Sequence, residues 1–185
     1  MKTTANRPPE RSYTEGVPAR PFLVSVTALR KSPGTVQHER RCGAIAGLEV
    51  TAARVPAHEE VCVEVDLESV HGGVMTHGFV TTRWEGECRR CLGLATGELR
   101  TEVRELFEQG SDEEETYRLR GEQLDLEPLA RDAVLLELPQ APLCAEACKG
   151  LCPMCGANRN EGGCQCESTD VDPRWAALDV LRQQK

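Results

Sequence analysis

The chain has 185 residues, and its 30 acidic against 22 basic side chains give a formal net charge of -8 at pH 7, which opposes general attraction to a polyanion such as nucleic acid. Two Trp, two Tyr and three Phe are too few for a surface that stacks RNA bases, and no apolar run of about 18 residues is present to span a membrane as a helix. Residues 1–21 lack the apolar segment of a secretion signal, so we expect a cytoplasmic protein whose ten cysteines stay reduced and free to bind metal.

The first part of the chain predicts a tail followed by short elements. Residues 1–20 are rich in proline and charge and cannot bury enough apolar surface to offset the cost of ordering, so we expect them to be disordered. A strand, one helical turn that ends before Ser32-Pro33-Gly34, and two further short strands should follow. In chain order, these four elements cover residues 22–26, 27–31, 36–41 and 44–52.

The clearest periodicity lies in residues 61–68, where apolar and polar side chains alternate. The apolar positions are Val61, Val63, Val65 and Leu67. A period of two places them on one face of a half-buried antiparallel strand. His71-Gly72-Gly73 then predicts a tight hairpin turn, and residues 74–85 return as the partner strand. The cysteine pair of Cys88-Arg-Arg-Cys91 follows where that strand ends.

Three later segments carry weaker signals. Residues 99–107 fit either a helix or a strand, and their β-rich surroundings favour a strand. The acidic run 110–115 is expected to be a solvated loop. Residues 128–138 predict a helix that begins with Pro128 and stops before Pro139. Its apolar face is expected to contain Leu129, Ala133, Val134 and Leu136. A last helix should begin after Asp172 as N-cap.

Six of the ten cysteines lie within residues 144–166. Two cysteines separated by two residues, as in Cys152-Pro-Met-Cys155, place two thiolates on one tight turn, here called a knuckle, which is typical of structural zinc sites. The first assignment is a four-cysteine zinc site made of Cys152, Cys155, Cys164 and Cys166. A second site, which joins the hairpin to the C-terminal segment, would then consist of Cys88, Cys91, Cys144 and Cys148. A different grouping stays open and takes Cys144, Cys148, Cys152 and Cys155 as one set. One or two zinc ions are therefore expected.

Other cysteine chemistry is less favoured by the sequence. Disulfides usually accompany a secretion signal, and a thioredoxin-like motif should open a helix, whereas Cys88 and Cys91 follow a strand. An iron–sulfur cluster is the third alternative. Cys42 and Cys62 belong to no motif and are expected to be unpaired, small apolar side chains. The four histidines have no ligand spacing and are expected at the surface.

The sequence contains no recognisable catalytic motif. There is no G-x-S-x-G, no phosphate-binding G-x-x-x-x-G-K-[ST] and no G-x-G-x-x-G after a strand. A catalytic zinc keeps one coordination position open, whereas sites made of four cysteines are usually closed. We therefore expect a protein that is not an enzyme.

Several motifs occur in a distinctive order along the chain. They are Cys88-Arg-Arg-Cys91, Asp132-Ala-Val-Leu-Leu-Glu-Leu-Pro139, Cys148-Lys-Gly-Leu-Cys152-Pro-Met-Cys155-Gly156, Asn160, Cys164-Gln-Cys166 and Asp172-Pro-Arg-Trp-Ala-Ala-Leu178. In this combination the chain, over residues 22–182, resembles the YceD family of bacterial large ribosomal RNA subunit accumulation proteins. The resemblance implies a role in the synthesis, processing or stability of that RNA, a β-rich N-terminal domain and no established catalytic activity. The family's gene often lies beside that of a zinc-binding large-subunit ribosomal protein, which suggests a basic protein as an alternative partner.

The prediction is an α+β, mainly β fold. A small antiparallel β-barrel-like domain covers residues 21–140, and residues 141–185 form a cysteine-rich zinc-binding module with a C-terminal helix. The predicted function is a non-enzymatic factor in large-subunit (23S) ribosomal RNA accumulation and ribosome assembly, in contact with that RNA or with a large-subunit ribosomal protein. Arg89 and Arg90, at the knuckle tip, are candidate contacts to phosphate or to an acidic partner. The alternative function is a zinc-thiolate redox sensor or interaction module.

Overall fold

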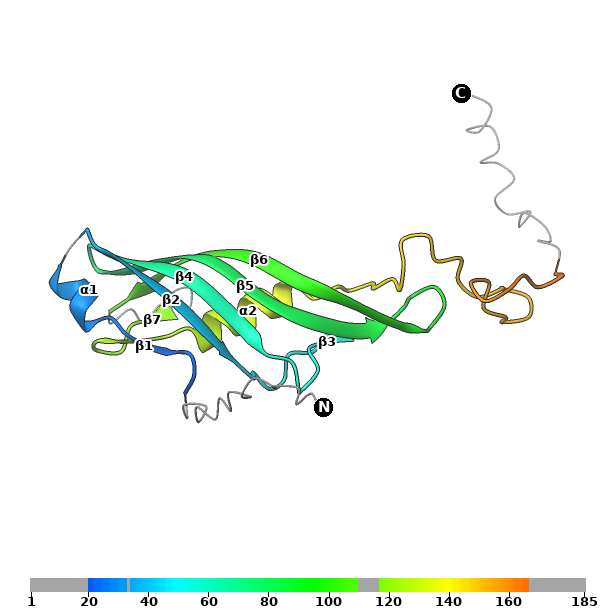
Figure 1. Ribbon diagram of the computed structural model, residues 1–185, viewed down its shortest axis with the longest axis horizontal. Coiled ribbons are helices and arrows are strands. Elements are labelled where there is room, and N and C mark those ends of the chain that lie inside the picture. The colour runs from blue at the N-terminus through cyan, green and yellow to red at the C-terminus, as the bar shows by residue number, and fades with distance from the viewer. Residues whose placement is uncertain (1–19, 33, 110–116, 167–185) are drawn as a thin grey trace, which may run out of the picture.

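The computed structural model describes residues 20–32, 34–109 and 117–166. Three predictions concern residues outside these ranges: the disordered tail, except for Arg20, the acidic loop at 110–115, and the last helix after Asp172. The described part contains an open sheet, a small strand pair and two helices (Figure 1). None of these helices has the length and apolar character needed to cross a lipid bilayer.

The larger sheet has six strands, and all of its pairings except β6 with β7 are antiparallel. Its strand order is β2-β4-β5-β6-β7, and β3 pairs with β5 beside this path. The strands are β2 (Val36–Gly43), β3 (Ala53–Arg54), β4 (Val61–Val70), β5 (Gly73–Glu87), β6 (Leu94–Glu108) and β7 (Tyr117–Arg118). A separate pair consists of β1 (Leu23–Ser25) and β8 (Gln123–Asp125). The helices are α1 (Thr27–Lys31) and α2 (Glu127–Glu137).

The predicted barrel-like closure is wrong. Among the described residues, β2 and β7 lie at opposite ends of the strand order and do not pair with each other, so the sheet stays open. A barrel buries its inner face by curling the sheet onto itself, whereas here α2 packs on that face and makes closure unnecessary. Figure 1 shows α2 along one face of the sheet, and no other described helix covers the opposite face.

The alternation predicted for residues 61–68 is confirmed. Val61, Val63, Val65 and Leu67 are at most 1% exposed, whereas Glu64 on the opposite face is exposed. The strand favoured for residues 99–107 is also confirmed, since it lies within β6 and buries Leu99, Val103 and Phe107. Gly72 has a φ of 90° in the β4–β5 turn, which glycine adopts without steric cost. Period-two patterns thus identified both faces of the sheet.

The helix predicted at 128–138 is present as α2, but its buried face differs from the expected one. The side chains that face the core are Leu126, Leu129, Ala130, Val134 and Leu138. Leu126, Ala130, Val134 and Leu138 are spaced four residues apart and therefore share one face. The first and the last of them lie just beyond the two ends of α2. Leu136, predicted to be buried, is 86% exposed because it lies on the far side of the helix.

Residues 44–52, predicted to be a strand, are a loop. Ile45 and Leu48 are buried in it, but they are three positions apart and do not alternate as in a strand. Only Glu49 forms a β-bridge there, with Arg54 of β3. The Val50 amide donates to the Ala53 carbonyl at 2.8 Å, so the chain reverses sharply over residues 49–54. Buried apolar side chains in this region therefore do not follow a strand period.

Cys42 and Cys62 form a disulfide, which corrects the prediction that they are unpaired apolar side chains with free thiols. They lie directly opposite each other in the register of β2 and β4, with Cα atoms 4.1 Å apart. Neither cysteine belongs to a motif, so only the strand register brings them together. The prediction of surface histidines is confirmed, since all four are exposed.

Candidate metal centre

The first knuckle is the turn between β5 and β6. Its fold is set by two backbone hydrogen bonds: the Cys88 amide donates to the Gly93 carbonyl at 2.8 Å, and the Leu92 amide donates to the Cys88 carbonyl at 2.9 Å. The turn therefore brings the Cys88 and Cys91 sulfurs to the same side. A long, regular hairpin thus presents two thiols at its tip.

Two cysteines from the C-terminal segment meet this knuckle. Together they form the bridging cluster, which consists of Cys88, Cys91, Cys144 and Cys148, with all four Sγ atoms within 4.8 Å of one another. The Sγ atoms of Cys88 and Cys148 are 3.8 Å apart, and those of Cys91 and Cys144 are 3.5 Å apart. Four thiolates placed tetrahedrally at about 2.3 Å from zinc would lie about 3.8 Å from each other. The donor set and its spacing therefore fit a zinc ion.

Further hydrogen bonds hold the C-terminal segment against the knuckle. The Arg89 amide donates to the Pro142 carbonyl, and the Leu151 amide donates to the Arg90 carbonyl, both at 3.0 Å. The Arg90 guanidinium donates to the carbonyls of Glu146 at 3.2 Å and Cys148 at 3.0 Å. The Arg90 side chain is thus engaged within the chain, and the partner contact assigned to Arg89 and Arg90 stays a prediction.

The second group of thiols, the local cluster, consists of Cys152, Cys155, Cys164 and Cys166, with Sγ atoms within 4.8 Å of one another. The Gly156 amide donates to the Cys152 carbonyl at 2.8 Å, which repeats the turn of the first knuckle. The structure therefore brings together the same two sets of four cysteines as the first sequence assignment. The other grouping is split, since Cys144 and Cys148 lie in one cluster and Cys152 and Cys155 in the other.

Asn160 connects the two clusters. It belongs to the loop of the local cluster, yet its Nδ2 donates to the Cys148 Sγ of the bridging cluster at 3.3 Å. Its Oδ1 accepts from the Lys149 amide at 2.8 Å, and its own amide donates to the Asn158 side chain at 3.0 Å. A hydrogen bond to a ligand sulfur stabilises the thiolate form. The sequence pattern contains Asn160 among its motif residues but does not indicate this role.

The environment of the clusters separates their thiols into two kinds. The backbone amide of Cys144, followed by those of Cys91 and Arg90, lowers the pKa of Cys88 to about 6 despite its burial. The backbone amides of Cys155 and Met154 lower the pKa of Cys152 to about 6 in the same way. One thiol in each cluster is therefore already ionised at neutral pH.

The remaining thiols include two that hold their protons strongly. Hydrogen bonding to Cys91, and then to Cys148, raises the pKa of Cys144 to about 12. Hydrogen bonding to Cys155 raises the pKa of Cys166 to about 12. A divalent cation that binds four thiolates displaces these protons. The clusters are thus built to exchange protons for a metal ion.

Burial differs between the clusters. Cys88 and Cys148 are buried beside Ala95 in a small apolar cluster, and Trp84 and Leu143 pack against it. In the local cluster Cys155 and Cys166 are exposed. Gly97 leaves room for the Trp84 ring, because a Cβ atom at Gly97 would come within 2.7 Å of that ring. The bridging cluster therefore has a packed apolar support, which the local cluster lacks among the described residues.

Comparison with known proteins adds three findings. A family model described as "Large ribosomal RNA subunit accumulation protein YceD" matches residues 76–182, a range that contains both clusters. Uncharacterized proteins of Mycobacterium tuberculosis and Mycobacterium bovis are each 37% identical over 173 residues, covering 86% of this chain and 81% of theirs. The large ribosomal RNA subunit accumulation protein YCED homolog 1, chloroplastic, of Arabidopsis thaliana is 39% identical over 62 residues, which cover 34% of this chain and 19% of that protein. No solved structure matches the chain.

Proposed function

Because the chain belongs to the YceD family, we propose that it is a non-enzymatic factor that supports large-subunit ribosomal RNA through its synthesis, processing or stability, and thereby ribosome assembly. The family description and the name of the plant relative support a role related to this RNA. Among the described residues, eight free cysteines gather in the bridging and local clusters.

The observation that carries the proposal is the bridging cluster. Its sulfurs join the tip of the β5–β6 hairpin to a segment 60 residues later in the chain, between Cys88 and Cys148. Zinc bound there would supply a closed structural link with no chemical turnover. The chain's residues would hold this ion by four thiolates, and Asn160 would stabilise one of them. The role of the metal is thus to fix a contact surface.

The direct partner is either the ribosomal RNA or a protein of the large subunit. The net charge of -8 disfavours a broad RNA-binding face and favours a basic protein partner. Arg89, which is exposed at the knuckle, is a proposed contact to phosphate where the RNA is the direct partner.

The test is depletion of the protein in its own organism, followed by quantification of large-subunit RNA and of large subunits by sucrose gradients. We expect both to fall relative to the small subunit, and we expect a chain with Cys88→Ser to restore them poorly. Normal levels of large-subunit RNA after depletion would overturn the proposed function.

A second candidate function is a redox sensor, because Cys144, Cys155 and Cys166 are exposed and thus accessible to oxidants. Peroxide would oxidise two zinc-bound thiolates to one disulfide while it is reduced to water, and the loss of two ligands would release the metal. Mild peroxide should then release zinc in step with cysteine modification, as measured by a colorimetric chelator and mass spectrometry. Thiols that stay unmodified while zinc stays bound would leave only the structural role.

A further inference from the structure

The two knuckles have the same backbone turn but different residues at its sharpest point. The residue after the second cysteine is Gly156 in the local cluster, with a φ of 73°, and Leu92 in the bridging cluster, with a φ of 58°. Both amides donate to the carbonyl of the first cysteine, at 2.8 Å and 2.9 Å. Leu92 is the one non-glycine residue with positive φ in the described part of the chain. Glycine adopts this conformation freely, whereas a leucine there is strained.

Burial does not compensate for this strain. Leu92 is 58% exposed, and Leu94, two residues later, is 69% exposed. A leucine in a strained position that gains nothing from the protein's own core points to a role in a contact with another molecule. The first knuckle thus differs from the second, because a glycine at the position of Leu92 would avoid the backbone strain.

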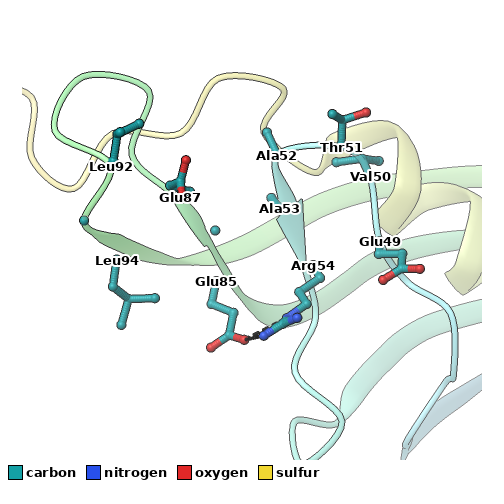
Figure 2. A pocket seen from close by; sticks show the side chains of 12 residues that line it. Glu49, Val50, Thr51, Ala52, Ala53, Arg54, Glu85, Glu87, Leu92 and Leu94 are labelled. Carbon is teal, nitrogen blue, oxygen red and sulfur yellow. Dashed lines mark hydrogen bonds and ion pairs between the residues drawn. The ribbon is translucent and has the colours of Figure 1, made fainter.

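Both leucines line a groove of about 560 Å³. Its other wall is the turn at residues 49–54, where β3 pairs with β5 and Ala53 lies opposite Gly86. A Cβ atom at Gly86 would collide with the Ala52 carbonyl oxygen, so this close pairing depends on a glycine at this position. Figure 2 shows Leu92 and Glu87 on the knuckle side of the groove and Thr51 and Ala52 across from them.

The charged side chains of the groove indicate which kind of ligand it can bind. Arg54 is neutralised by Glu85, with its Nη2 and Nε 2.7 Å and 2.9 Å from the Glu85 Oε1. Two further carboxylates line the groove, Glu49 and Glu87, and both are exposed and without an ion pair among the described residues. The groove therefore combines net negative charge with exposed leucines. This repels phosphate and complements a cationic, partly apolar chain.

We propose that this groove, lined by Glu49, Glu87, Leu92 and Leu94, binds a lysine- or arginine-rich segment of a partner protein that also carries apolar side chains. The segment's cations lie against the two free carboxylates, and its apolar side chains cover the two leucines. The inference deepens the proposed function, on whose basic protein partner it rests, by giving that partner a place on the chain; the groove would suit a basic partner in any assembly.

The test uses the full chain and a fluorescein-labelled peptide of seven lysines and two leucines, the leucines two residues apart. Binding is followed by fluorescence anisotropy and by NMR of leucine methyl groups. We expect saturable binding, weakened by salt, with shifts at Leu92 and Leu94. Leu136, a leucine on α2 that is more exposed than either of them, should not shift. The same peptide with glutamates in place of lysines, and a ten-residue oligouridine RNA, should not bind the groove.

Variants separate a binding role from a structural one. Leu92→Gly should raise the melting temperature by relieving strain, yet weaken peptide binding roughly fivefold to tenfold. The double variant Glu49→Gln with Glu87→Gln should weaken it roughly tenfold. Matched controls on α2, Leu136→Ala and Glu137→Gln, should leave it unchanged.

Unchanged binding by Leu92→Gly, equal binding of the glutamate peptide, or groove shifts caused by the RNA would overturn the inference. The outcome is independent of the depletion experiment. Normal ribosomal RNA on depletion would remove the proposed function and leave the groove intact. A peptide that fails to bind in the titration would remove the groove proposal and leave the proposed function intact.

Discussion

Each of the two cysteine clusters offers four thiol sulfurs as metal donors, but the two clusters connect different parts of the chain. The bridging cluster joins residues 53 and 60 positions apart and buries two of its cysteines beside an apolar cluster. The local cluster closes within residues 152–166 and exposes two of its cysteines. A metal in the bridging cluster therefore fixes the tertiary arrangement, whereas a metal in the local cluster orders a loop.

This difference teaches that identical ligands contribute unequally to a fold. Closing a long loop restricts the unfolded chain more than closing a short one, although the dependence on length is shallow. The larger contribution to stability is expected from the contacts between segments that accompany the bridging cluster. The bridging cluster is combined with the backbone contacts of Arg89 and Arg90 to the C-terminal segment, so its loss should loosen residues 141–151 from the hairpin.

The largest effect is expected from Cys88→Ser. In a chain that holds zinc in both clusters, it should reduce the bound zinc from two ions to one and destabilise the protein on the order of 3 to 5 kcal/mol, part of the roughly 10 kcal/mol or more that a structural zinc supplies. Limited proteolysis should then cleave residues 141–151, and native mass spectrometry gives the metal count. The matched control is Cys166→Ser, which should also lose one ion but leave residues 141–151 protected. Equal protease sensitivity of the two variants would contradict the distinction between the clusters.

Acid should affect both clusters in the same pH range. The folded-state pKa of about 6 for Cys88 and Cys152, against an ordinary value of 9.0, contributes stability that is complete above pH 9 and is lost as the pH falls to about 6. Below that pH both thiols are protonated, and metal binding competes with protons at every ligand. We expect zinc release, measured with a colorimetric chelator, to steepen below about pH 6. Release from the local cluster alone at that pH would show that burial protects the bridging cluster.

Asn160→Ala tests whether the clusters act on each other. The substitution removes the hydrogen bonds to the Cys148 sulfur and the Lys149 amide, which should cost about 1 to 2 kcal/mol. Zinc should leave the bridging cluster about 10 to 100 times more readily, as measured by the rate of transfer to a chelator. Asn160→Asp keeps the acceptor and loses the donor. Asn160→Asp should therefore keep the contact with the Lys149 amide, but zinc should leave its bridging cluster faster than it leaves the unchanged chain.

The smallest effect is expected from Gly156→Ala. The alanine would adopt a positive φ at the second knuckle, at a cost of about 1 kcal/mol. Thermal unfolding should shift downward by a few degrees, with both zinc ions retained at neutral pH. The comparison variant is Gly162→Ala, at a glycine with open space around its Cα atom and no positive φ, which should be close to neutral. A larger loss at Gly162 would argue against backbone strain as the cause.

Sequence patterns were informative where local chemistry decides the structure. The alternation of Val61, Val63, Val65 and Leu67 predicted β4, because side chains of a strand point to opposite faces in turn. Pro128 and Pro139 placed the ends of α2 within a residue or two. The buried face of α2 was less accessible, since Leu136 has the same apolar character as Leu129 and only the position of the sheet selects between them.

Leu92 illustrates a signal that was present but needed a structure to interpret. In the sequence, the glycine of the first knuckle stands one place later than in the second, at Gly93. The spacing alone does not reveal which residue takes the positive φ. The backbone shows that Leu92 takes it, and that its side chain lines the groove.

By itself, the sequence determined the strand alternation, the α2 segment and the pairing of cysteines into knuckles, because these depend on neighbours within a few positions. It also offered two sets of four cysteines as its first grouping, with a second grouping left open that the structure splits. Only the tertiary structure decided the open sheet, the Cys42–Cys62 disulfide, the role of Asn160 between the clusters and the acidic groove beside Leu92. Each of these joins residues that are far apart along the chain, and their meeting depends on strand register and on the packing of α2.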